Sequence, residues 1–139
     1  MAKDRIKKEV KFFKNNNIQK FELKFKKSQK NFDRFLLHEK NNDNIHFMLM
    51  FYKKSFDYPA HYSKNKSESF TVIKGKFKIK FYNKKGKIIQ QALLDDKNYF
   101  SYKLNKNIFH KIIPISKLCI ALEILDGPFV KNSVVKANW

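Results

Sequence analysis

Apolar residues recur with the period of a β-strand over most of this chain. Phe77, Ile79 and Phe81 alternate with lysines, which predicts a half-buried antiparallel strand. Segment 45–52 is apolar on both faces, as is typical of a buried strand. Similar short segments follow at hairpin spacing over 70–73, 88–94, 99–102, 108–113 and 118–125. Many short strands separated by turns predict an all-β barrel or sandwich.

One segment, in contrast, has the period of a helix. Ile18, Phe21 and Phe25 fall on one helical face of a lysine-rich stretch, so we expect an amphipathic helix over 17–29. A helix with a single apolar face packs on the outside of a core. It therefore predicts an element that covers the barrel without belonging to it.

The length of 139 residues corresponds to one structural domain. We divide it into an N-terminal arm and helix, 1–44, that packs on the barrel, and the barrel with its C-terminal tail, 45–139. No apolar run approaches the roughly 20 residues that a membrane span needs. The N-terminus also lacks the apolar core of a signal peptide. We therefore expect a cytoplasmic protein without a membrane span.

The formal net charge is +19, and a strongly positive charge is common in nucleic-acid-binding proteins. Here nearly all basic residues are lysine, and Arg5 and Arg34 are the only arginines. Lysine, asparagine, isoleucine and phenylalanine are abundant together, which is the pattern of AT-rich codons, whereas recognition of phosphate would also enrich arginine. We expect no specific nucleic-acid partner, although a basic nucleic-acid-binding protein stays a rival hypothesis. The diffuse positive field favours anionic small molecules.

The candidate site begins at His61, with Ser63, Glu68 and Gly75 behind it and His110 further along. Residues i and i+2 of a strand point the same way, so positions 61 and 63 both face the interior. The chain then turns onto the next strand, from which Glu68 points inward. Gly75 closes a hairpin, where a residue without Cβ fits best. We expect the side chains of His61, Glu68 and His110 to converge on one interior point.

These residues stand in register with the cupin pattern, which is His-x-His, four residues, Glu, six residues, Gly, and a second motif that ends in His. The chain as a whole resembles the WbuC family of cupin-fold metalloproteins, within the RmlC-like cupins, from about residue 10 to the end. The matching segments are Arg34 to His38, His61 to Gly75, Glu123 to Phe129 and Ala137 to Trp139. The resemblance implies an all-β cupin double-stranded β-helix, a jelly-roll barrel, with a short N-terminal α-helix.

The resemblance also implies metal ligands, which would be His61, Glu68 and His110. Ser63 departs from the pattern because it stands where a cupin carries its middle histidine, and a neutral hydroxyl is a poor substitute for imidazole. A divalent transition metal would be held weakly, and the sequence does not distinguish Zn, Ni, Mn and Fe. The alternative is a metal-free pocket in which His61 and His110 act as acid and base.

The WbuC family implies a role in bacterial surface-polysaccharide metabolism, of O-antigen or capsule. We expect the barrel pocket to bind a nucleotide-linked sugar, or to isomerise or epimerise it with His61 and His110 as catalytic residues. Arg34, His38 and Ser63 are the candidate substrate-binding residues. The alternative is a non-catalytic ligand-binding or regulatory cupin with a degenerate metal site. The expected partner is an anionic sugar, and a homodimer is compatible with the sequence.

Overall fold

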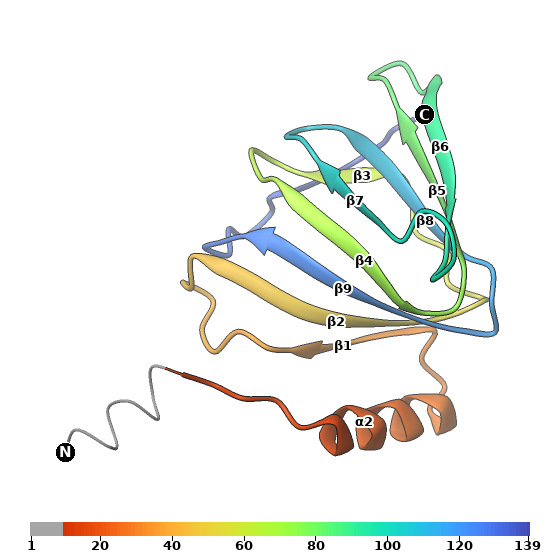
Figure 1. Ribbon diagram of the computed structural model, residues 1–139. Helices are drawn as coiled ribbons and strands as arrows, with labels where there is room; N and C mark the ends of the chain where they lie inside the picture. The colour runs from red at the N-terminus through yellow and green to blue at the C-terminus, as the bar shows by residue number, and fades with distance from the viewer. Residues whose placement is uncertain (1–9) are drawn as a thin grey trace.

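The computed structural model describes residues 10–139 and shows two five-stranded antiparallel sheets that face each other, with one helix outside (Figure 1). The first sheet has the strand order β1-β2-β9-β4-β7, and the second has the order β10-β3-β8-β5-β6. The elements are α2 (Asn15–Lys27), β1 (Phe32–Leu36), β2 (Ile45–Lys53), β3 (His61–Ser63), β4 (Glu68–Lys74), β5 (Phe77–Tyr82), β6 (Ile88–Leu94), β7 (Ser101–Leu104), β8 (Phe109–Pro114), β9 (Leu118–Asp126) and β10 (Val134–Lys136).

The all-β architecture with a short N-terminal helix agrees with the prediction from apolar periodicity. The helix is shifted by two residues toward the N-terminus from the predicted 17–29. The strand β7 is shifted by two residues toward the C-terminus from the predicted 99–102. No strand was predicted for β1, which pairs with β2 over its whole length. Within residues 10–139, no helix has the length and apolar character needed to cross a membrane.

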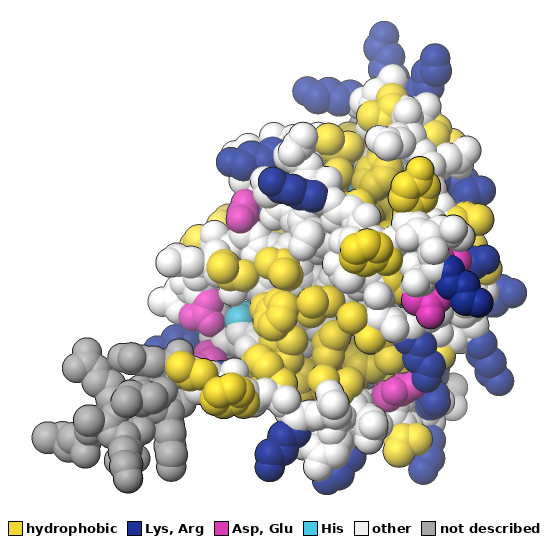
Figure 2. All heavy atoms as spheres, in the orientation of Figure 1, with side chains coloured by type: hydrophobic (Ala, Val, Ile, Leu, Met, Phe, Trp, Pro, Cys, Tyr) yellow, Lys and Arg dark blue, Asp and Glu magenta, His cyan; other side chains and the backbone are white. Residues whose placement is uncertain are grey.

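Two apolar clusters lie on opposite sides of the first sheet. The interior cluster fills the space between the sheets, and its buried members are Met48, Met50, Tyr52, Phe70, Val72, Phe77, Ile79, Leu94, Ile112, Cys119 and Ala121. The outer cluster lies under α2, and its buried members are Phe25, Leu37, Leu49, Phe51 and Ile120. Figure 2 shows apolar side chains gathered on the outer side of this sheet, with lysines around the margin of the view. The strand β2 contributes to both clusters because its successive residues point to opposite faces.

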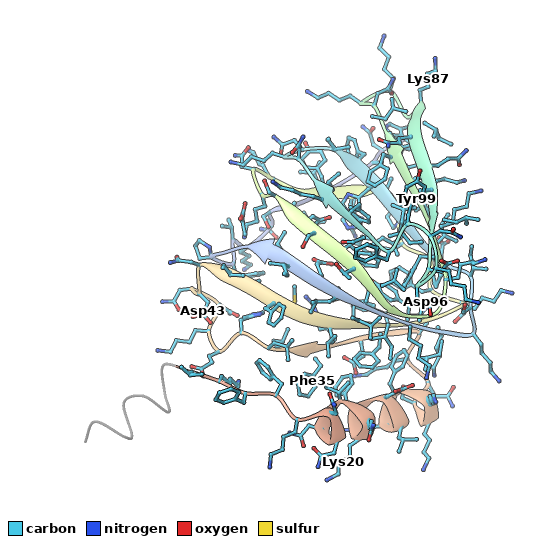
Figure 3. The ribbon with its side chains drawn as sticks, in the orientation of Figure 1. Lys20, Phe35, Asp43, Lys87, Asp96 and Tyr99 are labelled. Carbon is cyan, nitrogen blue, oxygen red and sulfur yellow. The ribbon has the colours of Figure 1, made fainter. Side chains whose placement is uncertain are left out.

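Aromatic rings of α2 pack against rings of the first sheet. The Phe21 ring lies 5.3 Å from that of Phe35 and 4.9 Å from that of Phe51, and the Phe25 ring lies 5.8 Å from that of Phe51. Figure 3 shows Phe35 directed from β1 toward the helix. The helix ends at Lys27, and the next residue, Ser28, caps it by donating a hydrogen bond of 2.7 Å from its hydroxyl to the Phe25 carbonyl. The helix thus covers the outer face and leaves the inner face to the pocket.

Two loop residues hold the candidate motifs in place through unusual backbone angles. Gly75 has φ +85°, and a Cβ there would lie 2.8 Å from the Leu118 carbonyl oxygen, so the hairpin position requires glycine. Asn107 has φ +62°, in the left-handed region that asparagine tolerates. Its side-chain oxygen accepts a hydrogen bond of 2.8 Å from the backbone N–H of Asn65. The loop before His110 is therefore tied to the loop that follows Ser63.

Candidate ligand-binding site

The inner faces of the two sheets enclose a cavity of about 590 Å³. Its wall is mostly apolar, with an aromatic end formed by Phe32, Tyr52, Phe56 and Tyr58. The polar side chains that reach it are Arg34, His38, Asn41, His46, His61, Ser63, Lys66, Glu68, Glu123 and Ser133. An apolar cavity of this size with a few polar groups is typical of a small-molecule site.

His61 reaches the cavity from the short strand β3, where it stands opposite His110 of β8. Its Nδ1 lies 3.0 Å from the Pro59 carbonyl oxygen. A carbonyl only accepts, so Nδ1 carries the proton and Nε2 of the neutral ring has a lone pair available. Burial lowers the pKa of His61, and the neighbouring His110 lowers it further. His61 is therefore a neutral imidazole near pH 7, which is the form that can accept a proton.

Behind His61 lies a buried ion pair. His110 Nε2 is 2.8 Å from Glu68 Oε1, and His110 Nδ1 donates to the Ile108 carbonyl oxygen at 3.1 Å. Burial opposes the charged form of His110, but the hydrogen bond and the charge of Glu68 outweigh it and raise the pKa of this imidazole. His110 is 2% exposed and does not line the cavity, whereas Glu68 does. His110 can reach a ligand only through its neighbours.

Glu123 is a pocket residue that the sequence analysis did not select. It lies on β9, beside Phe70 of β4, and its side chain lines the cavity close to Glu68. Burial, and then the charge of Glu68, raise the pKa of Glu123 to about 8. Its carboxyl is therefore mostly protonated at neutral pH and can donate a hydrogen bond. The available signal was an acidic residue at an inward position within the apolar segment 118–125.

All three predicted substrate-binding residues line the cavity. Arg34 projects from β1, with its guanidinium carbon 6.0 Å from the centre of the Phe32 ring. Ser63 lies on β3, two residues after His61 as expected. His38 stacks on His46, with ring centres 4.1 Å apart, and its Nδ1 accepts a hydrogen bond from a backbone N–H. His46 also lines the cavity and was not among the predicted site residues.

The predicted metal ligands are brought together, but they do not form a metal site. Across residues 10–139, no three His, Cys, Asp or Glu side chains are arranged to hold a metal ion. Both ring nitrogens of His110 are engaged, one with Glu68 and one with a backbone carbonyl. Ser63 offers only a hydroxyl where a third imidazole is needed. The residues present therefore do not fit the metal that the cupin pattern implies.

A histidine at position 63 should restore part of that site. We expect Ser63→His to bind Zn²⁺ or Ni²⁺ at least about tenfold more tightly than the unchanged protein, because it adds an imidazole beside His61. Elemental analysis and metal titration after dialysis against a chelator measure this. Ser133→His, also on the cavity wall but outside the motif, is the control. Stoichiometric metal in the unchanged protein, with no gain in Ser63→His, would contradict the prediction.

Two comparisons place the chain among known proteins. Residues 13–94 match the model of a family described as Domain of unknown function (DUF6016). Solved structures with a similar fold include the DMSP lyases RdDddP and RnDddQII (TM-score 0.60, 14% identity, 77% of this chain and 53% of that chain). They also include the capsular polysaccharide assembling protein CapF from Staphylococcus aureus (TM-score 0.62, 13% identity, 77% and 35%) and oxalate oxidase in complex with glycolate (TM-score 0.59, 9% identity, 79% and 57%). No curated protein matches the chain by sequence.

These likenesses confirm the cupin jelly-roll fold that the sequence predicted. At identities of 9–14% they concern the fold alone. The chain spans about half the length of the DMSP lyase and oxalate oxidase chains and about a third of CapF.

Proposed function

The chain belongs to the DUF6016 family, and we propose that it is a cupin that binds a nucleotide-linked sugar in its barrel and moves a proton beside the carbonyl of that sugar. One observation carries this proposal. A neutral imidazole, that of His61, and a protonated carboxyl, that of Glu123, line the same cavity of about 590 Å³. His61 comes from β3 of the second sheet and Glu123 from β9 of the first, and a base and an acid that reach one cavity are what α-proton transfer needs.

The charges along the cavity support an anionic ligand with an uncharged end. Arg34 and Lys66 line it, and the protein as a whole carries a formal net charge of +19. These cations suit a diphosphate. Glu68 and Glu123 suit sugar hydroxyls, which donate hydrogen bonds to carboxyl oxygens. The similarity in fold to CapF, and the WbuC-like segments described above, favour the setting of surface-polysaccharide metabolism.

The proton transfer uses side chains of this chain only. The Nε2 atom of His61 removes the proton from the carbon next to the carbonyl, and the electron pair of that C–H bond moves to the carbonyl oxygen. The protonated carboxyl of Glu123 donates a hydrogen bond to this oxygen as its charge develops. The oxygen then takes the proton of Glu123, the hydroxyl on the neighbouring carbon gives its proton to the Glu123 carboxylate, and His61 delivers its proton to the former carbonyl carbon, which gives the isomer. The Pro59 carbonyl orients the imidazole of His61, and burial together with the charge of His110 keeps it neutral.

Binding is the first property to measure. We expect calorimetry with a panel of nucleotide-linked hexoses and keto-hexoses to find a ligand, and Arg34→Gln to weaken its binding about tenfold, because a charge-assisted hydrogen bond to phosphate is lost. Lys103→Gln is the matched control, since it removes the same charge from an exposed position on β7. Equal affinities of the two variants would place the phosphate elsewhere. Failure of every sugar nucleotide to bind would remove the sugar hypothesis.

A non-catalytic, regulatory cupin is the second candidate, and the serine at position 63 favours it. The two candidates differ in one measurement. Proton transfer exchanges the α-hydrogen of a bound keto sugar with deuterated solvent, whereas binding alone does not. A ligand that binds without exchange would favour the regulatory reading.

A further inference from the structure

We propose that the free edge of β6 pairs with β6 of a second copy of this chain, in antiparallel register about Gln91. In residues 10–139, β6 is the last strand of the second sheet and pairs with β5, while its other side is bridged only at its end, where Leu94 pairs with Tyr99. An unpaired edge presents a row of backbone N–H and C=O groups that another strand can complete. The proposal concerns association and is independent of the pocket chemistry.

The composition of β6 sets it apart from the other edge strands of the described chain. Its residues, Ile-Ile-Gln-Gln-Ala-Leu-Leu, include no charge, whereas β1 carries Asp33 and Arg34, β7 carries Lys103, and β10 carries Lys136. Charged side chains, lysine above all, are what keep exposed edges from pairing. A chain with 31 Lys and Arg residues that has none on this strand leaves it open to pairing.

The side chains of β6 are also exposed and apolar. Ile89 is 59% exposed, Leu93 is 49% exposed and Ile88 is 42% exposed. Tyr99, which is 71% exposed, follows the strand and borders a shallow pocket with Leu93. In a monomer this apolar surface faces water, and a partner strand would cover it.

The sequence of β6 is complementary to itself, which is why the second copy is the partner we choose. With Gln91 opposite Gln91 of the second copy, Ile89 lies opposite Leu93, and both side chains are exposed in the single chain. This apolar pair occurs twice by symmetry. Apolar cross-strand pairs are the stabilising units of a sheet. The twofold axis passes through the Gln91 pair, as a closed dimer requires.

The flanking charges agree with the same register. Lys87 precedes the strand and Asp95 follows it, so Lys87 of each copy lies near Asp95 of the other, whose carboxylate is also 3.8 Å from Lys76 of its own copy. Figure 3 shows Lys87 and Asp96 at opposite ends of β6. Two chains with a net charge of +19 repel each other, and Lys78 and Lys80 of β5 stand beside Leu93 and Gln91, so the absence of charge on β6 itself is what permits a close approach.

Sedimentation equilibrium of the full chain and two variants tests the interface. We expect the unchanged chain to dimerise and Ile89→Lys to raise the dissociation constant by about tenfold or more, because two lysines replace two apolar pairs. Ile73→Lys is the control, since Ile73 is 54% exposed, also on a strand, and lies on β4. A monomeric unchanged chain, or equal effects of the two variants, would overturn the proposal.

Disulfide cross-linking tests the register. Gln91→Cys places two thiols opposite each other across the axis, at the Cα spacing of a cross-strand pair, roughly 4.5–5.5 Å, which a disulfide spans. Gln90→Cys is the matched control, because its partner would be Ala92. The native Cys119 is buried and does not interfere. We expect covalent dimers of Gln91→Cys and few of Gln90→Cys. Equal cross-linking of the two, or none in either, would overturn the register.

Discussion

Replacing His61 with asparagine is expected to lower turnover of a nucleotide-linked keto sugar by about 10²–10⁴-fold, the contribution typical of a general base. Asparagine keeps a polar group in the pocket but cannot take up a proton at Nε2. The side chain is only partly buried, so the fold should persist. Binding should weaken much less than turnover, because the base acts mainly in the transition state. Exchange of the α-proton in deuterated solvent, followed by NMR, measures the loss directly.

His46→Asn provides the comparison for that experiment. His46 also lines the cavity, but it donates from Nε2 to the Asn41 carbonyl oxygen and has no role in the proposed proton transfer. We expect it to change KM more than kcat. If the two variants lower the exchange rate equally, His61 is not the base, and the acid–base mechanism fails while ligand binding survives.

If the unchanged protein catalyses this exchange, its pH profile should also show the titration of His61. The pKa of His61 is lowered from 6.5, so the neutral, active form persists at neutral pH. Activity that depends on this base should therefore fall only as the pH drops below 6.5. His110 has a raised pKa, and its positive charge lowers the pKa of His61. Replacing His110 with Asn removes this charge, so the acid limb of the pH profile should move to higher pH.

Replacing Glu123 with glutamine should stabilise the fold relative to the unchanged protein, and this gain should be much larger at neutral pH than at pH 5. The pKa of Glu123 is about 8 in the folded protein against 4.5 for an ordinary glutamate. The folded state binds the Glu123 proton more tightly than the unfolded state does. The stability that this proton contributes is therefore fully present below pH 4.5 and is lost as the pH rises toward 8. Glutamine mimics the protonated carboxyl and does not titrate. We expect a gain of about 2–3 kcal/mol in unfolding free energy at pH 7.

Urea denaturation at pH 5 and pH 7.5 measures this difference. Glu39→Gln is the matched control, because Glu39 is exposed and the substitution changes the net charge equally. Its unfolding free energy should differ little between the two pH values. A Glu123→Gln variant with the same gain at both would mean that Glu123 is not held protonated in the fold.

Local patterns in the sequence predicted the parts of this structure that depend on few residues. The alternation of Phe77, Ile79 and Phe81 predicted β5, and the motif spacing predicted that His61, Ser63 and Glu68 face the cavity, as they do. Side-chain direction in a strand follows from counting by two, so these predictions need no knowledge of the partner strands.

What the sequence did not predict depends on contacts between distant segments. The strand β1 forms because β2 pairs with it, and its five residues lack a clear alternation of their own. His110 is buried as expected, but its ring is engaged by Glu68 and it does not line the cavity. The high pKa of Glu123 arises from its burial near Glu68, which is 55 positions earlier in the sequence. No local pattern records either relationship.

Because the two apolar clusters lie on opposite faces of the first sheet, α2 can detach without unfolding the two sheets. Detachment of α2 exposes the outer cluster around Phe25 and Phe51 and leaves the interior cluster between the sheets intact. Such an opening costs less free energy than global unfolding, because it gives up one cluster only. Amide hydrogens of the helix should therefore exchange with solvent sooner than those of β4 and β9. The cavity between the sheets should therefore keep its shape while α2 detaches and rebinds.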